Sequence, residues 1–349
     1  MTARKQGLGG KPLGEDSPLF GGKDSGEDPP REGSSAGEET AVEHPLPPWD
    51  PRADDFHRHP GPGPAGDGPE GAEEMIEAMR ALLPADESER SLDDWGRSER
   101  VVEAAAPLLD FYYEKWFRVE VGGIENVPTD SGGLLVSNHS GALPPDAAMI
   151  VWAIRNSHRN PRPVYVLGEH WFKGYPGVSM LVNKLGLVPA HRANAQRLLR
   201  DEGRLAIVFP EGQKATRKLL WQKYRLRRFG RGGFVRTAIR AQVPIVPVAV
   251  VGAEEAMPIF AHLGFLKKLT GLIYFPITPS FPHFGLAGAL MYLPAKFRIE
   301  FMEPIDMSQY PIDTIRDPAA IQAISEEIRG EIQTRLDEMV RARKSVWTG

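Results

Sequence analysis

The chain has 349 residues, a formal net charge of −4 and no cysteine. Its length allows one large domain or two small ones, and the lack of cysteine excludes disulfides, zinc–thiolate sites, iron–sulfur clusters and cysteine nucleophiles. Residues 1–70 hold 14 acidic and 7 basic side chains, so the remaining chain is mildly basic and suits anionic partners such as phosphates or lipid headgroups.

The first 72 residues are rich in Gly, Pro, Glu, Asp and Ser. Such a segment buries too little apolar surface to offset its ordering entropy, which predicts a disordered tail over 1–72. Residues 73–97 are predicted as a linker with a short helix. No apolar signal-peptide core and no run of ~18–20 apolar residues is present, so we expect a cytoplasmic protein with at most peripheral membrane contact.

A folded domain is predicted over 98–349, beginning with a helix over 98–117. Its apolar residues recur at spacings of three or four, and its end is aromatic. Two interpretations stay open for this helix: packing into the core, or lying on a bilayer surface.

Short apolar runs then alternate with helical patterns. Strands are predicted at 133–136, 164–167, 205–209 and 245–251, with an edge or half-buried strand at 297–301. Helices are predicted at 146–155, 193–201 and 232–241, and a last helix carries one apolar stripe: Ile321, Ile324, Ile328, Ile332, Leu336 and Met339. This alternation is typical of an α/β domain, which we expect to hold a single mixed, mostly parallel sheet flanked by helices.

The first motif that carries chemistry is SNHSGALPPD at 137–146, between a predicted strand and a predicted helix. Loops at strand ends of α/β sheets commonly bind ligands. His139 there can accept a proton from an attacking hydroxyl, and Asp146 can orient its ring. Taken alone, the pair is better explained by Asp146 as a helix N-cap and His139 as a loop residue whose hydrogen bonds are satisfied.

Three further motifs follow. FPEG at 209–212 ends a strong strand, and its Glu211 could grip hydroxyls or orient a base. LGLVPAHR at 185–192 could place Arg192 beside a phosphate. VPIVPVA at 243–249 has no reactive group and is interpreted as scaffold or as the wall of an acyl pocket. A strand-ending turn and a surface arginine are the plainer explanations of the first two.

In this order, across about residues 120–255, the four motifs resemble those of the glycerolipid acyltransferase family, the lysophosphatidate-acyltransferase-like enzymes. The resemblance implies His139 as general base and Asp146 as its partner. It also implies substrate contacts for Asn138, Arg192, Glu211 and Gly212. The expected partners are a lipid acceptor and an acyl thioester, acyl-CoA or acyl carrier protein, with no further cofactor and no metal.

The motifs depart from the family pattern at two points, and both bear on which lipid is the acceptor more than on whether an acyl group is transferred. Six residues separate His139 from Asp146, where the family usually has four, so we expect the loop to bulge and the pair to stay in contact. Gln213 follows FPEG, where Ser or Thr is usual. Two alternatives stay open: a lipid or thioester hydrolase that uses the same pair, and a non-catalytic lipid-binding relative. The sequence has no Gly-x-Ser-x-Gly nucleophile elbow, which counts against a serine esterase.

A basic segment follows FPEG and is interleaved with apolar residues. Its eight cations are Lys214, Arg217, Lys218, Lys223, Arg225, Arg227, Arg228 and Arg231. No nucleic-acid recognition motif accompanies them. A solvated charged face is one interpretation; contact with anionic headgroups or a CoA phosphate is the other. The apolar region 259–294 is interpreted as loops that enter the bilayer or cap the acyl pocket.

Overall fold

The computed structural model describes residues 92–141, 145–168, 176–263, 276–285, 288 and 291–349. The predicted disordered tail and residues 73–91 of the predicted linker lie outside this range. The described end of that linker packs against the domain: Trp95 contacts the core and its indole N–H donates to Glu202 at 2.9 Å.

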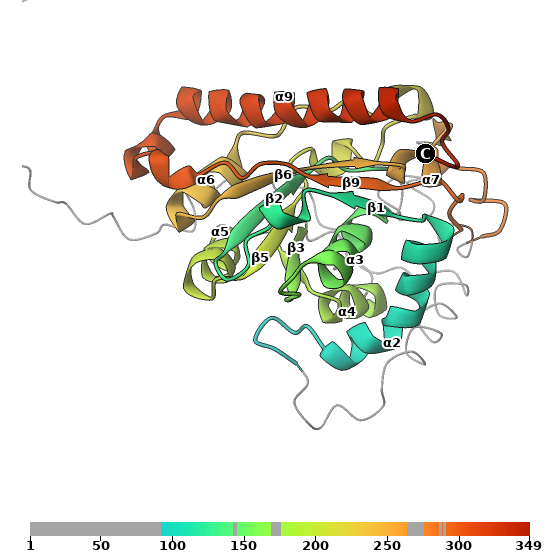
Figure 1. Cartoon of the computed structure of the whole chain (residues 1–349), viewed down its shortest axis with the longest axis horizontal. Helices are drawn as coiled ribbons and strands as arrows, with labels where there is room; N and C mark the ends of the chain where they lie inside the picture. The colour runs from blue at the N-terminus through green and yellow to red at the C-terminus, as the bar shows by residue number, and fades with distance from the viewer. Residues whose placement is uncertain (1–91, 142–144, 169–175, 264–275, 286–287, 289–290) are drawn as a thin grey trace, which may run out of the picture. The chain divides into compact units, whose positions relative to one another are not determined.

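The centre of the fold is a seven-stranded sheet with the order β1-β9-β6-β2-β5-β3-β4 (Figure 1). The strands are β1 (Glu120–Gly122), β2 (Gly133–Ser137), β3 (Val164–Gly168), β4 (Leu187–Pro189), β5 (Leu205–Val208), β6 (Ile245–Val251) and β9 (Arg298–Phe301). Strands β6, β2, β5, β3 and β4 run parallel, whereas β9 is antiparallel to β6 and parallel to β1. The prediction of a mixed, mostly parallel sheet is confirmed.

The central strands are continuous apolar runs in the sequence because their side chains are buried on both faces of the sheet. All seven residues of β6 are buried. Val246, Val248 and Val250 point into one core cluster, while Ala249 and Val251 point into the other. Because side chains alternate along a strand, such a run requires a helical layer on each face.

One helical layer consists of α2 (Glu99–Asp110), a π-helical turn η1 (Phe111–Trp116) and α3 (Asp146–Ser157). The aromatic end of the first helix divides between two environments: Tyr113 and Phe117 are buried, whereas Leu108 and Phe111 are exposed. Core packing is therefore confirmed for one side of this helix.

The opposite layer contains α5 (Arg192–Gln196), the π-helical turn η4 (Arg197–Asp201), α6 (Gly233–Ala241) and α9 (Pro318–Ala342). Figure 1 shows α9 running along this face of the sheet, across from α2 and α3. Asp317 caps α9 by accepting from the N–H groups of Ala319 and Ala320, and Pro318 opens its first turn. All six residues of the predicted apolar stripe are buried, which confirms its assignment to the core.

The remaining elements connect these layers. They include α4 (Pro176–Lys184), α7 (Ala253–Ala256), and a two-stranded ribbon of β7 (Ala261–His262) and β8 (Pro276–Ile277). Strand β9 has the half-buried alternation, which is one of the two predicted alternatives; it is not an edge strand, since β1 lies outside it. Within the described part of the chain, no helix combines the length and apolarity needed to cross a membrane.

We expect Ile332→Ala to lower the free energy of unfolding by about 2–5 kcal/mol, because Ile332 is fully buried between α9 and the sheet. Thr334→Ala, at an exposed position of the same helix, is the matched control and should change it by less than about 0.5 kcal/mol. Urea denaturation followed by circular dichroism measures both. Equal effects of the two substitutions would contradict the packing of α9.

Candidate active site

The carboxyl end of β2, at the centre of the sheet, carries the first site residues. Asn138 is buried and continues the ladder to β6: its side-chain oxygen accepts from the N–H of Val250 at 2.8 Å, and its amide nitrogen donates to Val250 O at 3.0 Å. An asparagine suits this position because its amide imitates a peptide group. Asn138 thereby fixes where the chain leaves the sheet, and its predicted contact with substrate stays a prediction.

His139 follows directly and contacts Asp146, the first residue of α3. The distance from His139 Nδ1 to Asp146 Oδ2 is 3.1 Å. The same carboxylate oxygen accepts from the backbone N–H of Ser140 at 2.8 Å and from its hydroxyl at 3.0 Å, and Oδ1 accepts from Ala147 N–H at 2.7 Å. The expected contact across the longer loop is therefore present.

The electrostatics of this pair define the state of the imidazole. Burial raises the pKa of Asp146, but the neighbouring His139 and the two donors of Ser140 outweigh it and hold the pKa below its ordinary value. An ionised Asp146 only accepts hydrogen bonds, so Nδ1 of His139 must donate to it. Nε2 is then the ring nitrogen that can accept a proton.

Phe209, at the end of β5, fixes the plane of that imidazole. The two rings stack with centroids 4.1 Å apart and planes inclined by 23°, and the His139 side chain is 16% exposed. One face of the ring is therefore covered by protein, while the ring remains accessible to a substrate.

Glu211, two residues later, lies behind His139. Its carboxylate accepts from His139 N–H at 3.2 Å and from Arg227 N–H at 2.7 Å, and pairs with Lys218 Nζ at 2.9 Å. The residue is 4% exposed. These contacts make Glu211 a support of the His139 loop; the acceptor contact that the resemblance implied is still a prediction.

Gly212 closes a tight turn at the end of the FPEG motif. Its φ of +58° is in the left-handed region that favours glycine. Its N–H donates to Phe209 O at 3.0 Å, so this donor is committed to the turn that carries Phe209. A role of Gly212 in lining the substrate site stays a prediction.

Arg192 opens α5 after β4, at the same edge of the sheet as His139. Strand β4 is the third neighbour of β2, which corresponds to about 14 Å at the usual strand spacing. Arg192 is half-buried and close to Arg236, whose pKa is lowered by burial and then by the charge of Arg192. It thus belongs to a more distant part of the same edge, and its predicted contact with substrate stays a prediction.

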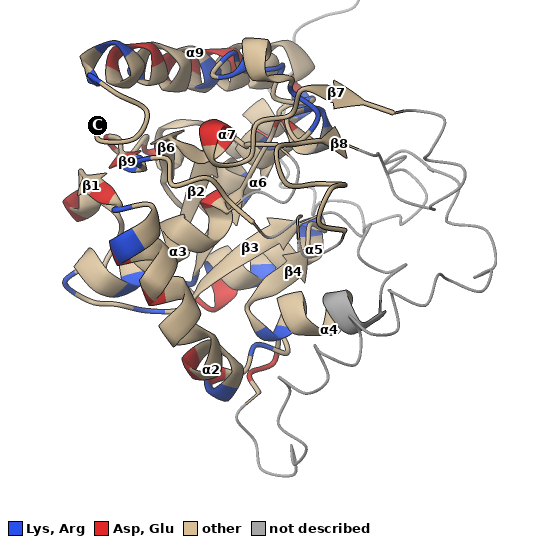
Figure 2. Ribbon diagram, turned by 90° about the vertical axis from the view of Figure 1, so that its right-hand side faces the viewer, with Lys and Arg blue, Asp and Glu red and all other residues tan. Residues whose placement is uncertain are grey.

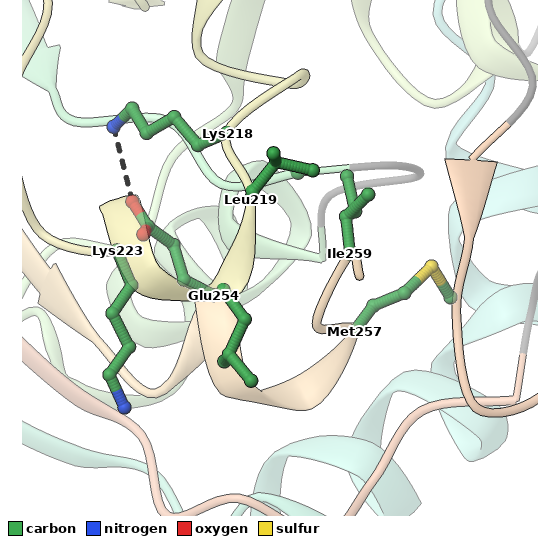
Figure 3. A pocket seen from close by; sticks show the side chains of 8 residues that line it. Lys218, Leu219, Lys223, Glu254, Met257 and Ile259 are labelled. Atoms are coloured by element: carbon green, nitrogen blue, oxygen red, sulfur yellow. Dashed lines mark hydrogen bonds and ion pairs between the residues drawn. The ribbon is translucent and has the colours of Figure 1, made fainter. Parts of the chain in front are cut away.

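Lys218 is the site residue that the sequence did not reveal. It was counted in the basic segment, yet its side chain is buried and paired with both Glu211 and Glu254. Lys223 of the same segment pairs with Glu255. A small pocket beside Gly141 is lined by these two lysines, Glu254 and apolar side chains that include Leu219, Met257 and Ile259 (Figure 3). Among the described residues, no cluster of three His, Asp or Glu side chains is arranged for a metal ion.

Comparisons with known proteins identify a family for this part of the chain. Residues 118–251 match the family model described as Acyltransferase, a range that includes β1 to β6 and extends over Asn138, His139, Asp146, Arg192, Glu211, Gly212 and Lys218. An uncharacterized protein of Mycobacterium tuberculosis is 40% identical over 260 residues, covering 74% of this chain and 72% of the relative.

More distant relatives are also found. A protein of Gallus gallus named "DGAT1/2-independent enzyme synthesizing storage lipids" is 29% identical, with 72% of each chain covered. The crystal structure of the 1-acyl-sn-glycerophosphate (LPA) acyltransferase PlsC from Thermotoga maritima is similar with a TM-score of 0.45 and 18% identity, covering 78% of this chain and 90% of that one.

The motif order, the acyltransferase family match and the long alignment at 40% identity lead to one conclusion. The chain belongs to the glycerolipid acyltransferase family and is an O-acyltransferase.

Proposed function

We propose that the enzyme transfers a fatty acyl group from a thioester, acyl-CoA or acyl carrier protein, to a hydroxyl of a lysophospholipid or other glycerolipid. The observation that carries this proposal is the contact between His139 and the buried, ionised Asp146. The pair leaves one imidazole nitrogen able to take a proton beside an accessible site.

In the proposed mechanism, Nε2 of His139 removes the proton of the acceptor hydroxyl as its oxygen attacks the thioester carbonyl. The tetrahedral intermediate then collapses, the C–S bond breaks, and the leaving thiolate takes the proton back from the imidazolium. Asp146 holds the ring and stabilises its positive charge. The thioester is already activated, so no covalent acyl-enzyme is required.

The decisive experiment supplies purified protein with labelled oleoyl-CoA and a panel of lysophospholipids, monoacylglycerol and diacylglycerol, and identifies products by mass spectrometry. Acylated lipid that forms only with an acceptor supports the proposal and identifies the acceptor. Labelled free fatty acid produced equally with and without acceptor would establish a hydrolase instead.

We expect His139→Ala and Asp146→Asn each to lower kcat by about 10²–10⁴-fold, because the first removes the base and the second removes the charge that orients it. His283→Ala, which removes an exposed histidine outside the pair, is the control and should keep its activity. Wild-type turnover in either of the first two variants would rule out the proposed base.

Ser140→Ala distinguishes direct transfer from a serine acyl-enzyme. The Ser140 hydroxyl donates to the ionised Asp146, so losing it removes a hydrogen bond worth about 1.5–3 kcal/mol of folding free energy. Asp146 keeps its contacts with the His139 ring, Ser140 N–H and Ala147 N–H, so kcat should fall by no more than about tenfold. A loss as large as that of His139→Ala, together with an acylated serine in the mass spectrum, would require a covalent mechanism.

A second part of the proposal is that the enzyme works at a membrane surface. Trp221, Phe260 and Phe284 are large apolar side chains that are 65%, 44% and 62% exposed. Phe260 directly precedes β7. Strand β7 contacts the basic segment, since His262 Nε2 is 2.9 Å from Arg217 O. Figure 2 shows Lys and Arg residues, in blue, beside β7. Six of the eight cations of that segment are exposed: Lys214, Arg217, Arg225, Arg227, Arg228 and Arg231.

Exposed aromatic residues next to cations favour binding to an anionic bilayer. We therefore expect the protein to float with vesicles containing phosphatidylglycerol, less so at high salt. A variant with Trp221→Ala, Phe260→Ala and Phe284→Ala should lose most of this binding. The control is Trp347→Ala, an exposed aromatic residue of the C-terminus. No flotation of the wild type at low salt would refute the membrane proposal.

A further inference from the structure

A buried ion cluster lies directly behind His139. Lys218 Nζ is 2.9 Å from Glu211 Oε2 and 3.1 Å from Glu254 Oε1, and the Lys218 side chain is 2% exposed. The three residues come from the turn after β5, the basic segment and α7, so the cluster joins three separate parts of the chain. Figure 3 shows the Lys218–Glu254 pair at the wall of the small pocket.

Burying these three groups is expensive. Each ionised side chain loses its hydration, and well-packed apolar residues would usually be at least as stabilising. Burial raises the pKa of Glu254 to about 7 even though Lys218 opposes this rise. A cluster of this kind is better explained by what it holds in place than by stability.

What it holds is the main chain of His139. Glu211 accepts the N–H of His139 at 3.2 Å, and Lys218 Nζ donates to the His139 carbonyl at 3.4 Å. The peptide groups on both sides of the His139 Cα are therefore fixed by the cluster, while Asp146 fixes the ring. Correct placement of a general base to within a fraction of an ångström depends on such support.

Glu254 completes the arrangement from the other side. It pairs with Lys218 and accepts the N–H of Tyr224 at 2.8 Å. Its neighbour Glu255 is equally buried but belongs to a different set, with Lys223, Tyr224 and Arg343 as partners. Glu255 is therefore the natural comparison for Glu254, since Glu254 pairs with the lysine that donates to the His139 carbonyl, whereas Glu255 pairs with Lys223.

We propose that Lys218, with Glu254 as its second counter-ion, is a positioning residue for the general base His139. The proposal rests on the proposed function and assigns to the enzyme a second support for its base, which acts on the backbone of His139 and not on its ring. Loss of the lysine ammonium should lower kcat and leave KM nearly unchanged, because Lys218 does not need to touch the substrate.

The absence of cysteine from the chain allows a clean test. Lys218→Cys introduces a single thiol, which 2-bromoethylamine, applied to the unfolded chain before refolding, converts to a near-isosteric lysine analogue. Iodoacetamide gives a neutral adduct on the same thiol. We expect kcat of Lys218→Cys to fall by about 10–100-fold with KM within about threefold, corresponding to about 1.4–2.8 kcal/mol of lost transition-state stabilisation. Aminoethylation should restore most of kcat, and the neutral adduct should not.

Lys296→Cys, treated in the same way, is the control and should keep kcat near the wild-type value throughout, because Lys296 is a largely buried lysine that pairs with Glu120 at 2.9 Å outside the candidate active site. If Lys218→Cys does not refold, Glu254→Gln replaces it, with Glu255→Gln as its control; we expect kcat to fall by about three- to tenfold in the first only. Equal losses in the two lysine variants, equal losses in the two glutamine variants, or equal rescue by the neutral adduct would overturn the proposal.

A measurement without substrate separates this inference from the proposed function. The imidazole ¹⁵N signals of His139 are identified in histidine-labelled protein by their absence from His139→Ala. They should shift in Lys218→Cys, or in Glu254→Gln where that variant replaces it, and stay unchanged in the matched control. Absence of acyl transfer by the wild type would refute the proposed function, whereas unchanged His139 signals in the test variant would refute the positioning role.

Discussion

The buried negative charge of Asp146 is the constraint on which the site depends. A carboxylate with no exposed surface must be compensated by nearby donors, because its hydration is lost on folding. Here the compensation comes from the His139 ring, the backbone and hydroxyl of Ser140, and the N–H of Ala147, the second residue of α3. Since His139 and Ser140 follow β2 and Asp146 begins α3, satisfying the charge also holds the end of β2 next to the start of α3. The lowered pKa of Asp146 makes its contribution to stability present at neutral pH and lost as the pH falls through its folded-state value.

The parallel strands give this constraint its location. The carboxyl ends of β2, β5 and β6 lie at one edge of the sheet, where they deliver His139, the Phe209–Gly212 turn and the chain that enters α7. Gly252 makes the last of these connections possible: its φ is +107°, and a Cβ there would lie 2.4 Å from Lys296 O. The sheet therefore brings together short segments that are far apart in the sequence.

Much of this arrangement could be predicted from the sequence, where the signal was long or chemically specific. The apolar run of β6 and the stripe of α9 are strong periodic patterns, and the ordered motifs identified His139 and Asp146. Strands β1 and β4 have three residues each and leave no usable periodicity. Lys218 was misread because a basic segment normally indicates a solvated face; only the fold shows that Glu211 and Glu254 converge on its ammonium. The FPEG motif likewise indicated Glu211 without revealing that its oxygens face the protein.

The stacking of His139 on Phe209 has a consequence for the stereochemistry of the reaction. With one face of the imidazole covered and Nδ1 turned towards Asp146, an incoming alcohol can reach Nε2 only from a restricted range of directions. The rest of the acceptor must then extend along one side of the ring. In the proposed mechanism, a glycerol backbone held in this way would present its hydroxyls unequally to His139, so the orientation of a single aromatic pair would contribute to regioselectivity without any contact between Phe209 and the reacting oxygen.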